Sequence, residues 1–245
     1  MEELKTSTRV LLLSAVIMIV ILVTGPLGYK FDLVPLMPSL ASLMVSLLGS
    51  MLLIAIGLIF TLIAVKNSLP RNRNLLLVSL ALCLLPIIVM GPQILKARSV
   101  PPIHDITTDM VNPPAFEALI KHRVHAINGL EYGSEEMPAE ELSELQKGAY
   151  PNVKPLEVGL SQSDALARAQ TVLAEQGLEI IATNPESGLV EATATTLWFG
   201  FKDDVVVRVS ETATGARIDI RSVSRVGVSD VGANAARIER FLTAF

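Results

Sequence analysis

Three long apolar segments dominate the first hundred residues of the chain. They run over about 10–28, 40–65 and 75–95, and none of them contains Asp, Glu, Lys, Arg or His. A helix of roughly twenty apolar residues crosses the hydrocarbon core of a bilayer, which is about 30 Å thick. The pattern therefore predicts three transmembrane helices. Because pumps and channels carry charge on ionisable side chains inside their spans, a transport role is disfavoured.

The basic residues around these segments predict how the chain is oriented. Lys5 and Arg9 precede the first segment, and Lys66, Arg71 and Arg73 lie in the loop before the third. The positive-inside rule places both regions in the cytoplasm. We therefore expect an inner (plasma) membrane protein with a cytoplasmic amino terminus and a carboxyl domain that is periplasmic or extracellular. A cleaved signal peptide is the alternative for the first segment, but no small-x-small cleavage pattern follows it.

Small residues recur on one side of the second apolar segment. They permit close approach between helices, and two interpretations stay open: contact with the other two spans, or a homo-oligomer formed through Ser42, Ser46, Gly49 and Ser50. The single cysteine, Cys83, lies in the third segment. This position excludes a disulfide or a catalytic thiol from the rest of the chain.

A proline-rich connection separates the apolar segments from the rest of the chain. Pro101 and Pro102 cannot continue a helix, and we expect residues 99–159 to form a linker with short helices over 115–126 and 134–148 and an extended stretch over 150–158. The predicted organisation is thus a transmembrane region (1–98), this linker (99–159) and a folded domain (160–245).

The last 86 residues alternate in a way that predicts secondary structure clearly. A helix over 160–177 precedes four strands over 178–183, 188–196, 204–210 and 216–223, and Asp230 or Ser229 caps a final helix. In the third strand Val205, Val207 and Val209 alternate with more polar neighbours, so one face of the sheet is apolar. The order α-β-β-β-β-α predicts an α+β two-layer domain in which two helices cover a four-stranded antiparallel sheet.

The charge balance differs between the two parts of the chain. Eight of the 20 basic residues but only three of the 24 acidic residues lie at or before Arg98. The remainder carries twelve basic and twenty-one acidic residues, so nucleic acid and anionic lipid head groups would be repelled by its net charge. The partners that we expect are the lipid bilayer and either a protein or an anionic small molecule, with no nucleic acid.

Polar residues near the ends of the second and fourth strands form the main candidate site. If the two loops meet, arginine forks near a helix amino terminus could hold a carboxylate or a phosphate. The alternative is a structural network in which the arginines pair with the acids. The candidate ligand-binding residues are Lys202, Asp203, Asp204, Arg221, Ser224, Arg225, Ser229, Asp230 and Asn234.

Two weaker candidates accompany this cluster. Trp198, Phe199 and Phe201 form an aromatic loop that could enter a membrane interface, although such a loop more often closes a core. His104, Asp105 and Asp109, with His122 and His125, are candidate metal ligands, but no established zinc pattern is present, so we expect no metal and no cofactor. No phosphate loop, nucleophile elbow or dinucleotide fingerprint occurs.

Two stretches of the carboxyl part carry a family resemblance. They are Phe199-Gly200-Phe201-Lys202-Asp203-Asp204 and Arg221-Ser222-Val223-Ser224-Arg225-Val226-Gly227-Val228-Ser229-Asp230. Over residues 113–245 the chain resembles domain of unknown function family 1499 (DUF 1499), many members of which also carry amino-terminal membrane helices. The resemblance implies no activity.

The sequence leaves two functional hypotheses open. The first is an uncharacterised integral membrane protein whose extracytoplasmic domain is a noncatalytic binding or assembly module of the cell envelope. The second is a hydrolase-like envelope enzyme that uses the same acids and arginines. A strongly perturbed carboxyl in a cleft would favour the enzyme, whereas saturated ion pairs would favour the module.

Overall fold

The computed structural model describes residues 2–245, which fall into two compact units. The first unit contains the residues up to Leu95 together with Trp198–Gly200, and the second contains Lys96–Leu197 and Phe201–Phe245. The division that we expected after residues 98 and 159 stays a prediction.

Three long helices occupy the amino-terminal part: α1 (Thr6–Lys30), α2 (Leu36–Lys66) and α3 (Pro70–Ser99). Each is long and apolar enough to cross a membrane, so the chain has the helices of a membrane protein. Each helix also extends beyond its apolar segment. At a rise of about 1.5 Å per residue, helices of 25 or more residues are longer than the thickness of the hydrocarbon core.

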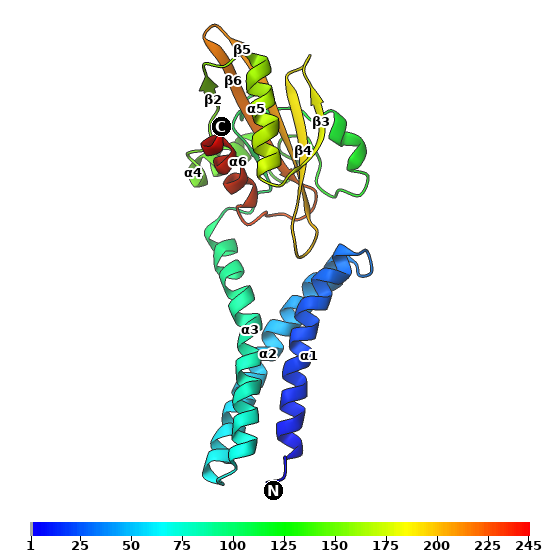
Figure 1. The fold of residues 1–245 in the computed structure, drawn as a ribbon, viewed down its shortest axis with the longest axis vertical. Helices are drawn as coiled ribbons and strands as arrows, with labels where there is room; N and C mark the ends of the chain where they lie inside the picture. The colour runs from blue at the N-terminus through cyan, green and yellow to red at the C-terminus, as the bar shows by residue number, and fades with distance from the viewer. Residues whose placement is uncertain (1) are drawn as a thin grey trace. The chain divides into compact units, whose positions relative to one another are not determined.

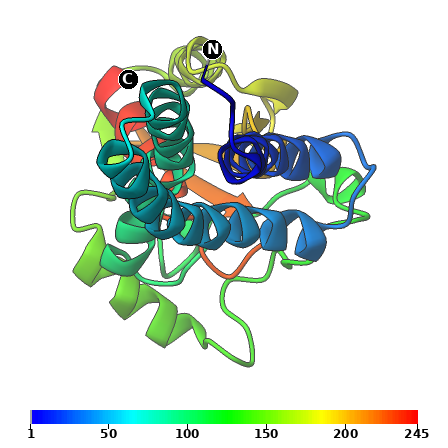
Figure 2. The same cartoon turned by 90° about the horizontal axis from the view of Figure 1, so that it is seen from below.

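The small residues of α2 contact α1, and these two helices lie side by side (Figures 1 and 2). Ser46 Oγ donates a hydrogen bond of 2.7 Å to the carbonyl of Met18. A Cβ atom added to Gly25 would lie 1.7 Å from Ser42 Oγ. Close helix approach within one chain therefore explains this stripe of small residues, and the homo-oligomer stays a prediction.

The second unit is built on an antiparallel sheet whose strands lie in the order β1-β6-β5-β4-β3, with β2 also paired to β6. The strands are β1 (Asp105–Thr107), β2 (Leu156–Val158), β3 (Glu179–Asn184), β4 (Leu189–Thr195), β5 (Lys202–Thr212) and β6 (Gly215–Ser224). An antiparallel sheet with helices is confirmed, but the prediction of four strands is wrong. The two additional strands come from residues 99–159 and contain three residues each, too few for alternation to reveal them.

Helices cover one face of this sheet, with α5 (Gln162–Glu175) and α6 (Ala233–Ala244) lying against it (Figure 1). Ser161 caps α5 by accepting a hydrogen bond from the Asp164 amide. The core between helices and sheet is mainly aliphatic, and its fully buried members include Val205, Val207, Ile218, Ile220, Leu173, Ile238 and Phe241. α4 (Ala139–Ala149) adds Leu142 to the same core.

Residues 108–131 contact the opposite face of the sheet. Phe116 and Leu119 from this segment are buried against Leu189, Val206 and Val223. The helix expected over 115–126 is wrong in length and type, because only a 3-10 helix, η1 (Ala118–His122), forms there. Both faces of the sheet are therefore covered, and this detail departs from the two-layer arrangement that we predicted.

Candidate functional site

Buried and partly buried charges lie along the sheet face that residues 108–131 contact. We call this the charged face and define it by Glu191, Asp204, Arg208, Asp219 and Arg221. The register pairs Asp204 with Val223, Val206 with Arg221 and Arg208 with Asp219 across β5 and β6. Directly paired residues in a sheet point to the same side, so these side chains form one row.

Asp204 is the most enclosed carboxylate of the charged face. It is fully buried, and Arg225 donates to both of its oxygens through Nε at 2.9 Å and Nη2 at 2.8 Å. Arg123 pairs with the same carboxylate, and Thr193 Oγ1 donates to it at 2.8 Å. The remaining Nη1 of Arg225 donates to the His122 carbonyl at 2.8 Å. A buried carboxylate with two arginines joins the segment 108–131 to the sheet.

Arg221 forms a second buried pair farther along β6. Its Nε and Nη2 donate to the two oxygens of Asp105 at 2.9 and 2.6 Å, and its other donors contact the carbonyls of Pro114 and Leu130. The guanidinium also lies 5.7 Å from the centre of the Tyr132 ring, as expected for a cation–π contact. Burial raises the pKa of the Tyr132 hydroxyl, with the nearby Asp105 carboxylate adding to the effect.

Glu191 binds backbone instead of an arginine. Its two oxygens accept hydrogen bonds from the amides of Glu117, Ala118 and Leu119 at 2.7 to 2.9 Å. These amides begin η1, where backbone N–H groups have no partner within the helix. The charge of Glu191 therefore positions residues 108–131, which we call the covering segment.

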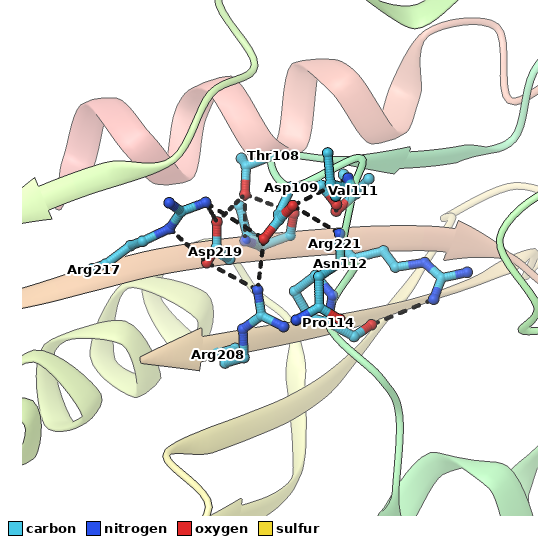
Figure 3. A network of polar contacts seen from close by, with 11 residues as sticks. Thr108, Asp109, Val111, Asn112, Pro114, Arg208, Arg217, Asp219 and Arg221 are labelled. Carbon is cyan, nitrogen blue, oxygen red and sulfur yellow. Dashed lines mark hydrogen bonds and ion pairs between the residues drawn. The ribbon is translucent and has the colours of Figure 1, made fainter. Parts of the chain in front are cut away.

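The partly exposed end of the charged face is a network of two arginines and two aspartates (Figure 3). Arg208 Nη2 donates to Asp109 at 3.0 Å and to Asp219 at 3.1 Å, and Arg217 Nε donates to Asp219 at 3.1 Å. Hydrogen bonding to Asp219 raises the pKa of Arg217. The formal charges of this network cancel, so it offers no excess charge to an anion.

The predicted nine-residue cluster does not form one site. Asp203 and Asp204 are neighbours in β5, so their side chains lie on opposite faces of the sheet. Asp203 pairs with Arg237 of α6 at 2.6 Å. Asn234 donates to Ser224 Oγ at 2.9 Å and accepts from Ser222 Oγ at 2.6 Å on this side.

The other predicted residues lie around the start of α6 or at the surface. Asp230 accepts hydrogen bonds from the amides of Gly232 and Asn234, both at 2.7 Å, and Ser229 Oγ accepts one from Val231. Burial raises the pKa of Asp230. Its two oxygens nevertheless bind amides at the start of α6. The predicted cap is wrong, because Gly232, and not Asp230 or Ser229, occupies the N-cap position. Lys202 is exposed.

The aromatic loop contains a contact between two rings, and the three histidines differ in exposure. The ring of Trp198 meets the buried Phe199 edge-on, with centroids 5.7 Å apart, and Phe201 is partly buried. His122 and His125 are exposed, whereas a ring nitrogen of His104 lies 3.3 Å from the Val228 carbonyl. Among residues 2–245, no group of three or more His, Cys, Asp or Glu side chains could hold a metal ion.

Sequence reasoning missed four residues that hold these networks together: Arg123, Glu191, Arg208 and Arg237. Two of them carried a usable signal, because Glu191 and Arg208 interrupt strands that are otherwise largely apolar. Arg123 and Arg237 carried none, since an arginine on a surface helix or loop is ordinary. Both acquire their role only through partners that are distant in the sequence.

These contacts leave little capacity for a small ligand at the predicted positions. The charge-bearing donors of Arg221 and Arg225 already have acceptors within the chain. An open hollow on α6, lined by Ala236, Glu239, Arg240, Thr243 and Ala244, includes none of the candidate side chains. The geometry is that of a rigid, ion-paired structure.

Comparison of the sequence with models of protein families identifies the family of this chain. The model of the family described as "Protein of unknown function (DUF1499)" matches residues 105–245. The match starts at the first residue of β1, so it includes the covering segment as well as the sheet. No curated protein and no solved structure matches the chain.

Proposed function

This chain belongs to the DUF1499 family of proteins of unknown function, and we propose that it is a noncatalytic binding or assembly module of the cell envelope. The helices α1, α2 and α3 anchor it in the inner membrane. In this proposal the amino terminus is cytoplasmic and the second unit lies in the periplasm or outside the cell, as the basic residues flanking the helices predict.

One observation carries the noncatalytic part of the proposal: both arginines predicted to bind a ligand are saturated by partners within the chain. Arg221 holds Asp105 through two donors, and Arg225 holds Asp204 through two donors. An anion would have to displace a buried carboxylate from its arginine, and a carboxylate left without its partner in a protein interior is costly. We therefore favour a protein partner over a small anionic ligand.

A hydrolase-like enzyme remains the second candidate because one carboxyl group is perturbed. The pKa of Asp230 is raised, as is common for a catalytic acid. However, burial causes the shift, and the two carboxylate oxygens accept hydrogen bonds from the amides of Gly232 and Asn234 at the start of α6. This use of Asp230 to position the start of α6 favours the module.

The first experiment screens the full-length protein, purified in detergent micelles, for a thermal shift with phosphates, carboxylates, lipid head groups and divalent metals. A ligand that binds only the folded state raises the apparent stability. We expect no shift from these compounds. A shift that Arg225→Ala abolishes would instead establish an anion site and overturn the preference for a protein partner.

Two further measurements test the partner and the location. A photoreactive residue at exposed positions such as Val111 on the covering segment and Glu144 on α4 is irradiated in native membranes. We expect one specific crosslinked product with a partner protein, and we expect it to form only at those positions that lie in the contact surface. A reporter fused after Phe245 should behave as extracytoplasmic, and cytoplasmic activity would contradict the proposed orientation.

A further inference from the structure

Two loops lie side by side at the end of the sheet where β6 ends. The amides of Ile127 and Asn128 donate to the Arg225 carbonyl at 2.9 and 3.0 Å. The side chain of Asn128 donates to the carbonyls of Ser224 and Gly227 at 3.0 and 2.9 Å. The residues after η1 and the residues after β6 are thus joined into one surface.

This surface presents apolar side chains to the outside. Val124, Ile127 and Val228 are 74% to 79% exposed, and Ile120 of η1 is exposed as well. We call these four residues the apolar ledge. Large apolar residues grouped on a surface mark a contact site more often than isolated ones do.

The ledge is held in place from beneath by buried charges. Arg123, next to Val124, pairs with Asp204, and Arg225 binds the same carboxylate. The side chains of both arginines are largely buried, although their neighbours point outward. The ledge is therefore a fixed feature of the fold, since its backbone is tied to the most enclosed carboxylate of the charged face.

A short tether connects the ledge to a candidate membrane span. α3 ends at Ser99, and Ile103 already accepts a hydrogen bond from the Asp230 amide. His104 accepts one from the Ser224 amide, and its ring lies 3.3 Å from the Val228 carbonyl. The four residue steps from Ser99 to Ile103 span at most roughly 14 Å. The loop that carries Val228 is therefore within a short distance of the point where the chain leaves α3.

The polar residues beside the ledge suit a lipid surface. Lys121, His122 and His125 are exposed between the apolar side chains, and Lys96 and Arg98 lie in the last turn of α3. Interfacial protein segments place apolar side chains at the boundary of head groups and acyl chains, with basic side chains among the head groups. The net negative charge of the second unit as a whole disfavours anionic lipid, but these basic residues lie together and attract anionic head groups locally.

We propose that the apolar ledge inserts into the head-group region of the bilayer in which α3 is anchored. The occupant is lipid, because covalent attachment keeps this end of the unit near the membrane surface and because exposed basic residues border the apolar ones. The inference goes beyond the proposed function, and it requires neither a partner nor a ligand.

The test uses the full-length protein in nanodiscs of phosphatidylcholine and phosphatidylglycerol that hold one chain each. Cys83, the single cysteine, is replaced by Ala, and an environment-sensitive fluorophore is attached in separate variants at Val124→Cys, Ile127→Cys and Val228→Cys. Val111→Cys is the matched control, because it replaces a valine of the same unit that is 97% exposed and lies outside the ledge. Equal thermal midpoints confirm that each labelled variant is folded.

We expect blue-shifted emission at the three ledge positions and several-fold stronger quenching by spin-labelled lipids than at position 111. Quenching by aqueous iodide at all three positions that equals the control overturns the proposal. Protection from iodide without quenching by lipid also overturns it, because protein would then cover the ledge. These outcomes are independent of the ligand screen, so the two proposals can fail separately.

Discussion

The two faces of the sheet in the second unit are built from alternating residues of the same strands, yet they are stabilised differently. Val205, Val207 and Val209 of β5 point toward α5 and α6 and belong to the apolar core. Asp204 and Arg208 of the same strand point the other way and meet partners of opposite charge. The helix-covered face is thus held mainly by apolar burial, with the Asp203–Arg237 pair at one end, whereas the charged face is held mainly by specific pairs.

This difference shows how each covering layer is selected. An apolar core accepts any arrangement that fills it well, since burial is nondirectional. A buried charge accepts only a partner in the correct place, because an unpaired charge in the interior is very costly. Residues 105–131 contain little regular structure. Their position is fixed by two ion pairs, Asp105 with Arg221 and Arg123 with Asp204, and by the backbone amides that donate to Glu191.

The largest effect should come from Asp204→Ala, which leaves Arg123 and Arg225 without their carboxylate. Loss of one member of a buried ion pair costs about 3 to 5 kcal/mol. Hydrogen exchange of the β5 and β6 amides measures the local free energy of opening. Glu144→Ala, which removes an exposed carboxylate paired with Lys147, is the control and should change little. Equal effects of the two variants would refute the assigned role of Asp204.

Replacement of Arg221 sharpens the comparison because its partner can be removed at the same time. Arg221→Met alone should cost about 3 to 5 kcal/mol, since Asp105 stays buried and unpaired. The double variant with Asp105→Leu should recover most of this loss, because an apolar pair of similar volume often replaces a buried ion pair without penalty. A purely additive cycle, measured by the same exchange experiment, would show that the two side chains do not interact.

At the apolar positions of the helix-covered face, stability should depend on the volume of the side chain. Ile220 is fully buried beneath the helices, and Ile220→Ala should cost roughly 2 to 5 kcal/mol through lost burial and the cavity left behind. Ile220→Val, which removes one methylene, should cost only about 0.5 to 1.5 kcal/mol. Thermal unfolding of both variants in micelles checks this order, and a larger effect of the valine variant would contradict it.

At the partly exposed end of the charged face, the same kind of pair should contribute little. Arg217 is more exposed than the other arginines of the charged face, and its pairing with Asp219 and Asp109 is screened by solvent. Arg217→Ala should therefore cost at most about 1 kcal/mol. An effect as large as that of Asp204→Ala would mean that burial does not distinguish the two ends of the face.

Asp230 should give a small dependence of stability on pH. Burial raises its folded-state pKa above the ordinary value of 3.8, because the buried site favours the uncharged, protonated carboxyl group. Protonation of Asp230 therefore stabilises the folded state, and this contribution is fully present below pH 3.8. This contribution is lost as pH rises through the raised folded-state pKa. Relative to the natural protein, Asp230→Asn should therefore become more stable as pH increases across that window. Unfolding midpoints measured along a pH series, with Glu144→Gln as the background, test the sign.

Much of the candidate chemistry could be identified from the sequence, but its grouping could not. The alternation in β5 already predicted that Asp204 and Val205 face opposite sides. Arg123 lies 81 residues before Asp204, and Asp105 lies 116 residues before Arg221, so no local pattern connects them. In the sequence Asp105 resembles only a possible metal ligand, because its partner Arg221 lies beside it only once β1 pairs with β6.

The sequence by itself determined the three apolar helices, the succession of α5, the four longer strands and α6, and the apolar face of the sheet. These features depend on local periodicity, which reports how each segment divides between apolar and polar surroundings. The tertiary structure alone decided that β1 and β2 join the sheet, that residues 108–131 cover its second face, and that the acids and arginines form separate saturated pairs. The physical reason is that short strands and buried ion pairs are stabilised by partners distant along the chain, and such partners leave no periodic pattern in the sequence.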